Sequence, residues 1–269
     1  MAELPFVMIA SAVAIVVTLT ALWLVSVVVK DASIIDIFWG PGFVLVAWVA
    51  YLFSDGVEAR KLLLATLATV WGLRLGIYLA WRNLGHGEDP RYQAMRERAE
   101  QAGKNFALTS YARVYLLQGT VMWIVSLPLQ LGQTYNTPEV LGPLAWLGSA
   151  VFAIGFLFEA FGDYQLAAFK ADPAHKGLVM DRGLWRYTRH PNYFGNACLW
   201  WGIFLVSVEN SVGWWGLISP VFMTFLLLKV SGVSLLEKSL SETKPAYRDY
   251  VERTSAFFPL PPKAARDRG

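Results

Sequence analysis

The chain has 269 residues, of which 55% are hydrophobic and 16% are charged, and its formal net charge is +3. A soluble domain of this size normally carries about 25% charged residues, and here the charges are missing from whole stretches of the chain. This pattern excludes an ordinary soluble domain and indicates a membrane protein. It also predicts one domain over residues 1–269, because no Pro-rich or Gly/Ser-rich linker divides the chain.

Seven segments are long and apolar enough to cross a bilayer as helices, which takes roughly 20 residues each. In chain order they cover residues 4–29, 34–54, 62–81, 107–131, 140–162, 193–209 and 212–232. The first segment lacks a basic flank and a small-residue cleavage site, so we interpret it as a transmembrane helix and not as a signal peptide. Polar loops over 82–106 and 163–192 and a polar tail over 233–269, which begins with a surface helix over 233–253, complete an all-α polytopic membrane protein.

The basic residues predict the orientation in the membrane. With the N-terminus outside, the outer loops contain only Arg60 and Lys61, and the inner loops and tail contain all other Lys and Arg residues outside the spans. Cytosolic loops of membrane proteins are enriched in Lys and Arg. We therefore expect the two long loops and the C-terminus to be cytosolic.

Ionisable side chains inside the spans indicate a polar cavity. Such residues are costly in a bilayer and usually face a bundle interior or a wet cavity. The alternative is a set of structural ion pairs within the bundle, such as Asp36 with Arg74. In the predicted orientation the ionisable residues all fall in the cytosolic half of the membrane, accompanied by the neutral Gln118; they are Asp36, Arg74, Arg113, Glu159 and Asp163.

The densest group of chemically active side chains lies in residues 183–196, with the sequence GLWRYTRHPNYFGN. Pro191 suits the first turn of a helix, and a helix N-terminus beside several cations favours an anion. The segment therefore predicts a site for a diphosphate or a carboxylate. Basic anchors for lipid headgroups would explain its cations, but they do not explain Asn192 and Asn196, which share one helix face and lead into the bilayer.

The other cytosolic loop contains the alternating charges of residues 88–92, EDPRY. Such a run is usually a solvated surface. The functional alternative is a lid over the cavity, with Arg91 and Tyr92 as its contacts.

Several classes of site are absent from the sequence. It has no Gly-x-Gly-x-x-Gly fingerprint and no Walker loop. Three His residues and one Cys argue against a structural zinc or a c-type haem. Basic and aromatic residues do not alternate along a soluble stripe, so nucleic acid is a poor candidate. We expect no metal, no nucleic acid and no protein partner, and we expect contact with membrane lipids.

The run Arg-His-Pro-Asn-Tyr-Phe-Gly within residues 183–202 resembles the signature of the steroid 5-alpha-reductase family, most closely its bacterial branch. This likeness implies a bacterial cytoplasmic membrane, and it extends over almost the whole chain. A shorter His-Pro version also occurs in membrane methyltransferases similar to isoprenylcysteine carboxyl methyltransferase. The other matching motifs are Asp36-Ile-Phe-Trp-Gly40, Leu73-Arg-Leu, Glu88-Asp-Pro-Arg-Tyr92, Leu117-Gln-Gly119, Asp163-Tyr-Gln-Leu166 and the tail from Tyr247 to Pro259.

The resemblance implies a seven-helix reductase that binds NADPH from the cytosol among its later helices. Residues 186–190 would fit the diphosphate and the extra phosphate of this cofactor. The family usually has Glu where this chain has Asn196. The implied cofactor-binding residues are Asp163, Lys170, Arg186, Tyr187, Arg189, His190, Asn192 and Asn196.

The expected reaction is reduction of a C=C bond conjugated to a carbonyl in a lipophilic substrate, steroid-like or isoprenoid, of the kind catalysed by 3-oxo-5-alpha-steroid 4-dehydrogenases. Hydride would pass to the carbon beta to the carbonyl, and a donor near the carbonyl oxygen would stabilise the developing enolate. The candidate donors are Asp36, in its neutral form, Tyr78 and Tyr92. Arg74 and Gln118 are the candidate substrate-binding residues.

Two other functions stay open. A methyltransferase that uses S-adenosylmethionine would carry adjacent acidic residues after the last span, where this chain has Glu237 followed by Lys238. A lipid-binding relative without catalysis would bind a lipid and turn over neither cofactor.

Overall fold

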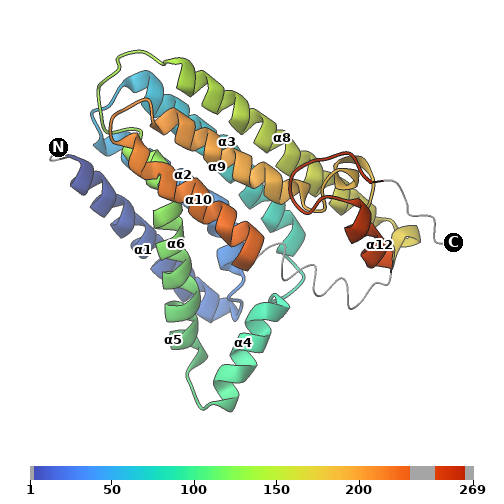
Figure 1. The fold of residues 1–269 in the computed structure, drawn as a ribbon. Helices are drawn as coiled ribbons and strands as arrows, with labels where there is room; N and C mark the ends of the chain where they lie inside the picture. The colour runs from blue at the N-terminus through green and yellow to red at the C-terminus, as the bar shows by residue number, and fades with distance from the viewer. Residues whose placement is uncertain (1–2, 231–245, 264–269) are drawn as a thin grey trace. The chain divides into compact units, whose positions relative to one another are not determined.

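The computed structural model describes residues 3–230 and 246–263 of the chain (Figure 1). Over these residues the protein is helical and has no β-strand, apart from one isolated bridge between Thr188 and Ser255. The all-α fold class expected from the sequence is confirmed.

Within the described ranges, five helical segments are long and apolar enough to cross a membrane. They are α1 (Glu3–Val29), α2 (Ile34–Phe53), α3 (Glu58–Asn83), α8 (Pro143–Ala171) and the segment Gly213–Val230, which comprises η4 (Gly213–Leu217), α10 (Ile218–Phe225) and η5 (Leu226–Val230). The shorter elements are α4 (Pro90–Gln101), α5 (Phe106–Ser110), η1 (Tyr111–Leu116), α6 (Leu117–Val125), α7 (Leu127–Leu131), η2 (Pro173–His175), η3 (Gly183–Arg186), α9 (Pro191–Ser207) and α12 (Ala246–Arg253).

Two sequence-predicted spans are not among these five. Residues 107–131 are helical in the consecutive pieces α5, η1, α6 and α7, and α9 has only 17 residues. Seven spans and an external N-terminus therefore remain predictions.

The predicted polar loops contain more helix than expected. The loop over 82–106 includes α4, and α8 continues through Asp163 to Ala171, well into the loop predicted over 163–192. Asp163, the first residue of that predicted loop, is helical and buried in the structure. In the tail, α12 lies within the predicted helix over 233–253, whose first residues fall outside the described ranges.

Contacts between Cα atoms group the chain into two compact units, residues 1–146 with 204–219 and residues 147–203 with 220–269. The first contains α1 to α7 and η4. The second contains most of α8 and α9 together with η2, η3, η5 and α12. The single domain expected from the sequence stays a prediction.

Glycines bring helices together in the first unit, where α2 packs along α3. A Cβ atom added at Gly72 would lie 2.5 Å from the carbonyl oxygen of Gly40, and one at Gly76 would lie 2.8 Å from the ring of Pro41. Small residues allow close approach of helices in a membrane, where dispersion contacts and not the hydrophobic effect drive packing. The helices α2 and α3 are therefore packed closely against each other.

In the second unit, glycines likewise bring α8 and α9 into close contact. A Cβ atom at Gly155 would lie 2.5 Å from the carbonyl oxygen of Gly195, and one at Gly202 would lie 2.6 Å from the carbonyl oxygen of Gly148. The two backbones are thus in contact along much of the helix pair. Side chains beside this glycine seam are held at short range across it.

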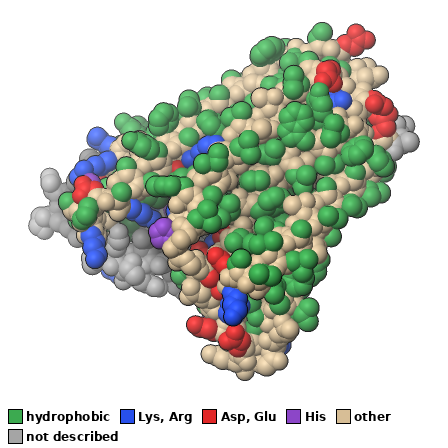
Figure 2. Space-filling model, turned by 180° about the vertical axis from the view of Figure 1, so that it is seen from behind, with side chains coloured by type: hydrophobic (Ala, Val, Ile, Leu, Met, Phe, Trp, Pro, Cys, Tyr) green, Lys and Arg blue, Asp and Glu red, His purple; other side chains and the backbone are tan. Residues whose placement is uncertain are grey.

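The surface fits a membrane environment. Large apolar side chains such as Val28, Leu52 and Ile77 are 70% or more exposed. Figure 2 shows hydrophobic side chains over much of the visible face. In a soluble protein such patches would be unusual, but in a bilayer they contact lipid.

Candidate functional site

The first unit contains a polar cluster of four side chains: Asp36, Arg91, Tyr92 and Gln118. The Tyr92 hydroxyl donates to Asp36 Oδ1 at 2.8 Å and accepts from Gln118 Nε2 at 3.1 Å. Arg91 Nη2 donates to Asp36 Oδ2 at 2.7 Å. Three residues predicted to act on the substrate, one on each of three separate elements, are therefore connected by hydrogen bonds.

The start of α4 is fixed against the turn that connects α1 and α2. Glu88 accepts from the backbone N–H of Ala32 at 2.8 Å and pairs with Arg96 at 2.8 Å. Asp89 caps α4 by accepting from the backbone N–H of Arg91 at 2.9 Å, which satisfies one of the free donors of a helix N-terminus. These contacts place Tyr92 over the first turn of α2, where Asp36 lies.

A π-helical turn, η1, precedes Gln118 in the chain. Single π-turns inside helices shift the face that the following residues present, and they are frequent at functional sites. Here the same helical segment directs Tyr115 to the backbone carbonyl of Ala32, at 3.3 Å, and Gln118 to Tyr92. The π-turn therefore contributes to the placement of Gln118.

The electrostatics of this cluster keep the phenol of Tyr92 protonated. Burial, and then the neighbouring charge of Asp36, hold the pKa of Tyr92 well above its ordinary value. The hydrogen bond from Arg91 lowers the pKa of Asp89, and the same bond raises the pKa of Arg91. Tyr92 is thus a hydrogen-bond donor over the whole physiological pH range.

The other two predicted residues of this unit, Arg74 and Tyr78, lie together on α3. The Arg74 guanidinium is 5.3 Å from the centre of the Tyr78 ring, and Arg82 approaches the same ring at 5.7 Å. Both Arg74 and Tyr78 are half-buried. Tyr78 also contacts Trp81 on the same helix, with 6.1 Å between ring centres.

The second unit brings together the polar residues of α8 and α9. Asn192 Nδ2 donates to Asp163 Oδ1 at 3.0 Å, and Asn196 Nδ2 donates to Glu159 Oε2 at 3.1 Å. The two carboxylates are buried, with 5% and 4% of their surface exposed. The helix α9 begins at Pro191, as the sequence predicts, and the two Asn residues do share one face.

The other predicted cofactor-binding residues of this unit divide into two groups. Lys170, Arg186 and Tyr187 are exposed. Arg189 and His190 are buried: Arg189 Nη1 donates to the carbonyls of Val251 and Thr254, at 2.9 and 2.7 Å. His190 stacks on Tyr193 with 5.3 Å between ring centres.

The segment before α9 is braced on two sides. Trp185 Nε1 donates to the carbonyl of Gly162 on α8 at 3.0 Å, and the Tyr250 hydroxyl of α12 donates to the Trp185 carbonyl at 2.5 Å. Gln165 accepts from the backbone N–H of Leu184 at 3.0 Å. The braces hold the basic segment against α8 and the tail.

Glu159 is the residue that the sequence-predicted site omitted. Its position in an apolar span marked it as part of a polar cavity, but no motif assigned it a role. The available signal was its spacing: Glu159 and Asp163 are four residues apart, as are Asn192 and Asn196, so two helices each present a matching pair.

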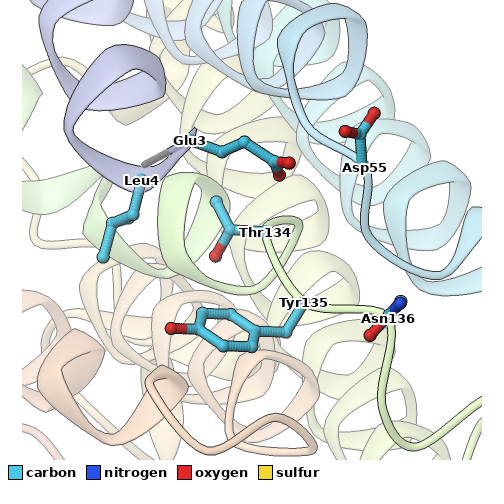
Figure 3. A pocket seen from close by; sticks show the side chains of 6 residues that line it. All are labelled: Glu3, Leu4, Asp55, Thr134, Tyr135 and Asn136. Carbon is cyan, nitrogen blue, oxygen red and sulfur yellow. The ribbon is translucent and has the colours of Figure 1, made fainter. Parts of the chain in front are cut away.

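A cavity lies elsewhere in the first unit. It has a volume of about 240 Å³ and contains none of the predicted site residues (Figure 3). A smaller one, of about 50 Å³, adjoins the turn before α2 and the loop after α3. The larger cavity is lined by Glu3, Leu4, Asp55, Thr134, Tyr135 and Asn136.

A family of known proteins matches a region of this chain that includes the residues of both polar clusters. The model of a family described as "Protein of unknown function (DUF1295)" matches residues 22–254. An uncharacterised protein of Schizosaccharomyces pombe is 24% identical over 265 residues, which cover 88% of this chain and 75% of the yeast protein. No solved structure gives a significant match.

Proposed function

The chain belongs to the DUF1295 family, whose description names no activity, and we propose that it is an NADPH-dependent membrane reductase. Its substrate would be a lipophilic molecule, steroid-like or isoprenoid, with a C=C bond conjugated to a carbonyl. The proposal rests on the likeness to the steroid 5-alpha-reductase family together with the geometry of the second unit.

One observation carries the proposal. Asp163 and Asn192 are 29 positions apart in the chain, and the likeness assigns both to the cofactor; their side chains are 3.0 Å apart. The exposed cations Lys170 and Arg186 lie on the segments that lead away from this pair along the chain. A carboxylate and an amide next to cations match the hydroxyl and phosphate groups of a dinucleotide.

A buried atom supports the fit of this cofactor. The Oδ1 atom of Asn196 is buried and has no hydrogen-bond partner among the described residues. Buried polar atoms nearly always have one. A ligand that offers an N–H or O–H group would supply it. The residues that would hold the cofactor are Asp163, Lys170, Arg186, Asn192 and Asn196.

In this proposal NADPH supplies the hydride when bound, and the chain supplies the donor. Tyr92 is our preferred donor, because its hydroxyl lies between Asp36 and Gln118 and its raised pKa keeps it protonated. The single hydroxyl proton is donated to Asp36, so donation to the substrate requires that this bond be exchanged for one to the carbonyl oxygen of the substrate. Asp36 would then orient Tyr92 and would not itself serve as the acid.

A cofactor screen by thermal shift on the detergent-purified chain tests the proposal. NADPH should raise the melting temperature by ligand linkage, and Asp163→Asn and Asn192→Ala should weaken that effect. Asn136→Ala, an exposed amide of the first unit, is the matched control and should leave it unchanged. Arg189 is a poor choice for this test, because its bonds to the tail backbone make any loss ambiguous.

Three outcomes would replace the proposal. No shift at about millimolar NADPH, a concentration at which a cofactor with a Kd of about 10 μM would stabilise the protein by about 2.7 kcal/mol, would exclude the reductase proposal. A shift with S-adenosylmethionine alone would assign the chain to membrane methyltransferases. Binding of a lipid with no response to either cofactor would indicate a lipid-binding protein without catalysis.

A further inference from the structure

We propose that the cavity shown in Figure 3 binds a membrane phospholipid whose headgroup ends in a primary ammonium group. The cavity has a volume of about 240 Å³ and lies where α1 begins and where α2 leads into α3. These three helices are long and apolar enough to cross a membrane, so their ends lie at the level of the lipid headgroups. The cavity contains none of the residues assigned to NADPH or to its substrate, and the inference therefore goes beyond the proposed function and does not depend on it.

The lining of the cavity is negatively charged. Two carboxylates contribute to it, Glu3 at the start of α1 and Asp55 between α2 and α3, and the other four lining side chains are uncharged. Figure 3 shows the Glu3 side chain extending from α1 toward the side of the cavity on which Asp55 lies. Neither carboxylate forms an ion pair with the described part of the chain. A cation is therefore the ligand that complements this lining.

The basic residues nearest to Asp55 along the chain are engaged elsewhere. Arg60 is buried and donates to the backbone carbonyls of Gly132, at 2.8 Å, and of Tyr135. Lys61 pairs with Glu58 at 3.6 Å. Neither Arg60 nor Lys61 lines the cavity. Arg60 thus holds the segment that forms one wall, and a ligand is left to neutralise the carboxylates.

Buried acceptors at this end of the unit lack donors. Thr134 lines the cavity and is buried, and its one hydroxyl proton is donated to the carbonyl of Leu131 at 2.9 Å, so it offers an acceptor to a ligand. Gln133 directly precedes it. The Gln133 amide nitrogen donates to the carbonyls of Ala47 and Leu129, at 3.1 and 2.8 Å, and its buried oxygen has no hydrogen-bond partner among the described residues. Buried polar atoms nearly always have a partner, and a cation that carries several hydrogens would suit this set of acceptors.

Exposed aromatic side chains beside the cavity favour a lipid as the carrier of that cation. Phe6 on α1 and Phe53 on α2 are exposed, and their rings are in contact, with 5.4 Å between centres. They are three residues from Glu3 and two residues from Asp55 along the chain, so an apolar surface adjoins the carboxylates. A phospholipid could place its ammonium in the cavity and an acyl chain against the two rings. A primary ammonium has three N–H donors, whereas a trimethylammonium keeps the charge and has none.

The test compares phosphatidylethanolamine with phosphatidylcholine of identical acyl chains, which differs from it only by three methyl groups on the nitrogen. Native mass spectrometry of the detergent-purified chain measures the affinity for each lipid. The wild type should bind phosphatidylethanolamine about tenfold or more tightly, because the methylated headgroup loses its charge-assisted hydrogen bonds. Glu3→Gln and Asp55→Asn should each reduce this preference, and the double variant should bind both lipids nearly equally. Glu139→Gln, at an exposed carboxylate that does not line the cavity, is the matched control and should keep the preference.

Equal affinity of the wild type for the two lipids would overturn the proposal, and this comparison needs no variant. A preference that persists in the double variant would place the lipid elsewhere and would overturn it as well. Displacement of the bound lipid by an excess of free ethanolamine would show that a soluble amine is the ligand, and the assignment to a lipid would then be wrong. NADPH takes no part in these measurements, so their failure would leave the reductase proposal intact.

Discussion

Replacement of Tyr92 by Phe should destabilise α4 more than replacement of Arg91 by Ala, although Arg91 makes the shorter hydrogen bond to Asp36. The Tyr92 hydroxyl is buried and makes two hydrogen bonds, one of them to a carboxylate. Their loss should cost about 2.5–4 kcal/mol, with about 1.5–3 from the charged bond and about 1 from the neutral one. The side chain of Arg91 is 67% exposed, and exposed ion pairs contribute about 0.2–1 kcal/mol.

Hydrogen exchange of the slowest backbone amides in α4 measures this difference. Since about 1.4 kcal/mol corresponds to a factor of ten, Tyr92→Phe should accelerate their exchange by about 60- to 700-fold. Arg91→Ala loses exposed ion pairs to Asp36 and Asp89 and should accelerate it by no more than about 30-fold. A Tyr92→Phe variant that exchanges like the wild type, or an Arg91→Ala variant that exchanges faster than it, would refute the argument from burial.

Three further changes test other parts of the structure. Gly195→Val should lower the melting temperature, because the valine side chain would meet the backbone of α8 at a cost of about 1–3 kcal/mol. Tyr164→Val, at an exposed position of α8, should leave the melting temperature unchanged. Arg91 lowers the pKa of Asp89. The ionised carboxyl of Asp89 therefore stabilises the folded protein above the pKa that Asp89 has in the unfolded chain, and this stabilisation is lost as the pH falls through the pKa of Asp89 in the folded protein. Pepsin cleavage near α4 should therefore increase below about pH 4 in the wild type, and Asp89→Asn should lack this pH-dependent component. Arg189→Gln should expose the end of α12, which loses two hydrogen bonds, and trypsin should cut faster after Arg253; an unchanged rate would show that the tail does not depend on Arg189.

Local patterns in the sequence predicted the parts of the site that depend on neighbouring residues. The start of α9 at Pro191 and the shared face of Asn192 and Asn196 follow from proline geometry and helical spacing. Spacing shows that Glu159 and Asp163 share one face of α8, but it does not show which of them each Asn contacts, because the pairing depends on where two distant helices meet. The same is true of Asp36: the sequence offered Arg74 as its ion-pair partner, and the structure shows Arg91 and Tyr92, the two residues named as contacts of a lid formed by the loop over 82–106.

Arg189 shows why a cation next to a helix start is ambiguous in a sequence. The carbonyls at a helix C-terminus carry partial negative charge and can accept from a guanidinium as a phosphate does. The position of α12 is a long-range feature of the fold, so no local pattern could show that Arg189 binds its end.

One consequence concerns the phosphates of the proposed cofactor. If Arg189 serves the tail, their binding depends on exposed cations such as Lys170 and Arg186, and exposed charges are screened by salt within about 10 Å at 0.1 M. NADPH affinity should therefore fall as NaCl is raised from low to near-molar concentration. An NADPH affinity that does not change with salt would mean that buried cations hold the phosphates, and the assignment of Arg189 to the tail alone would be wrong.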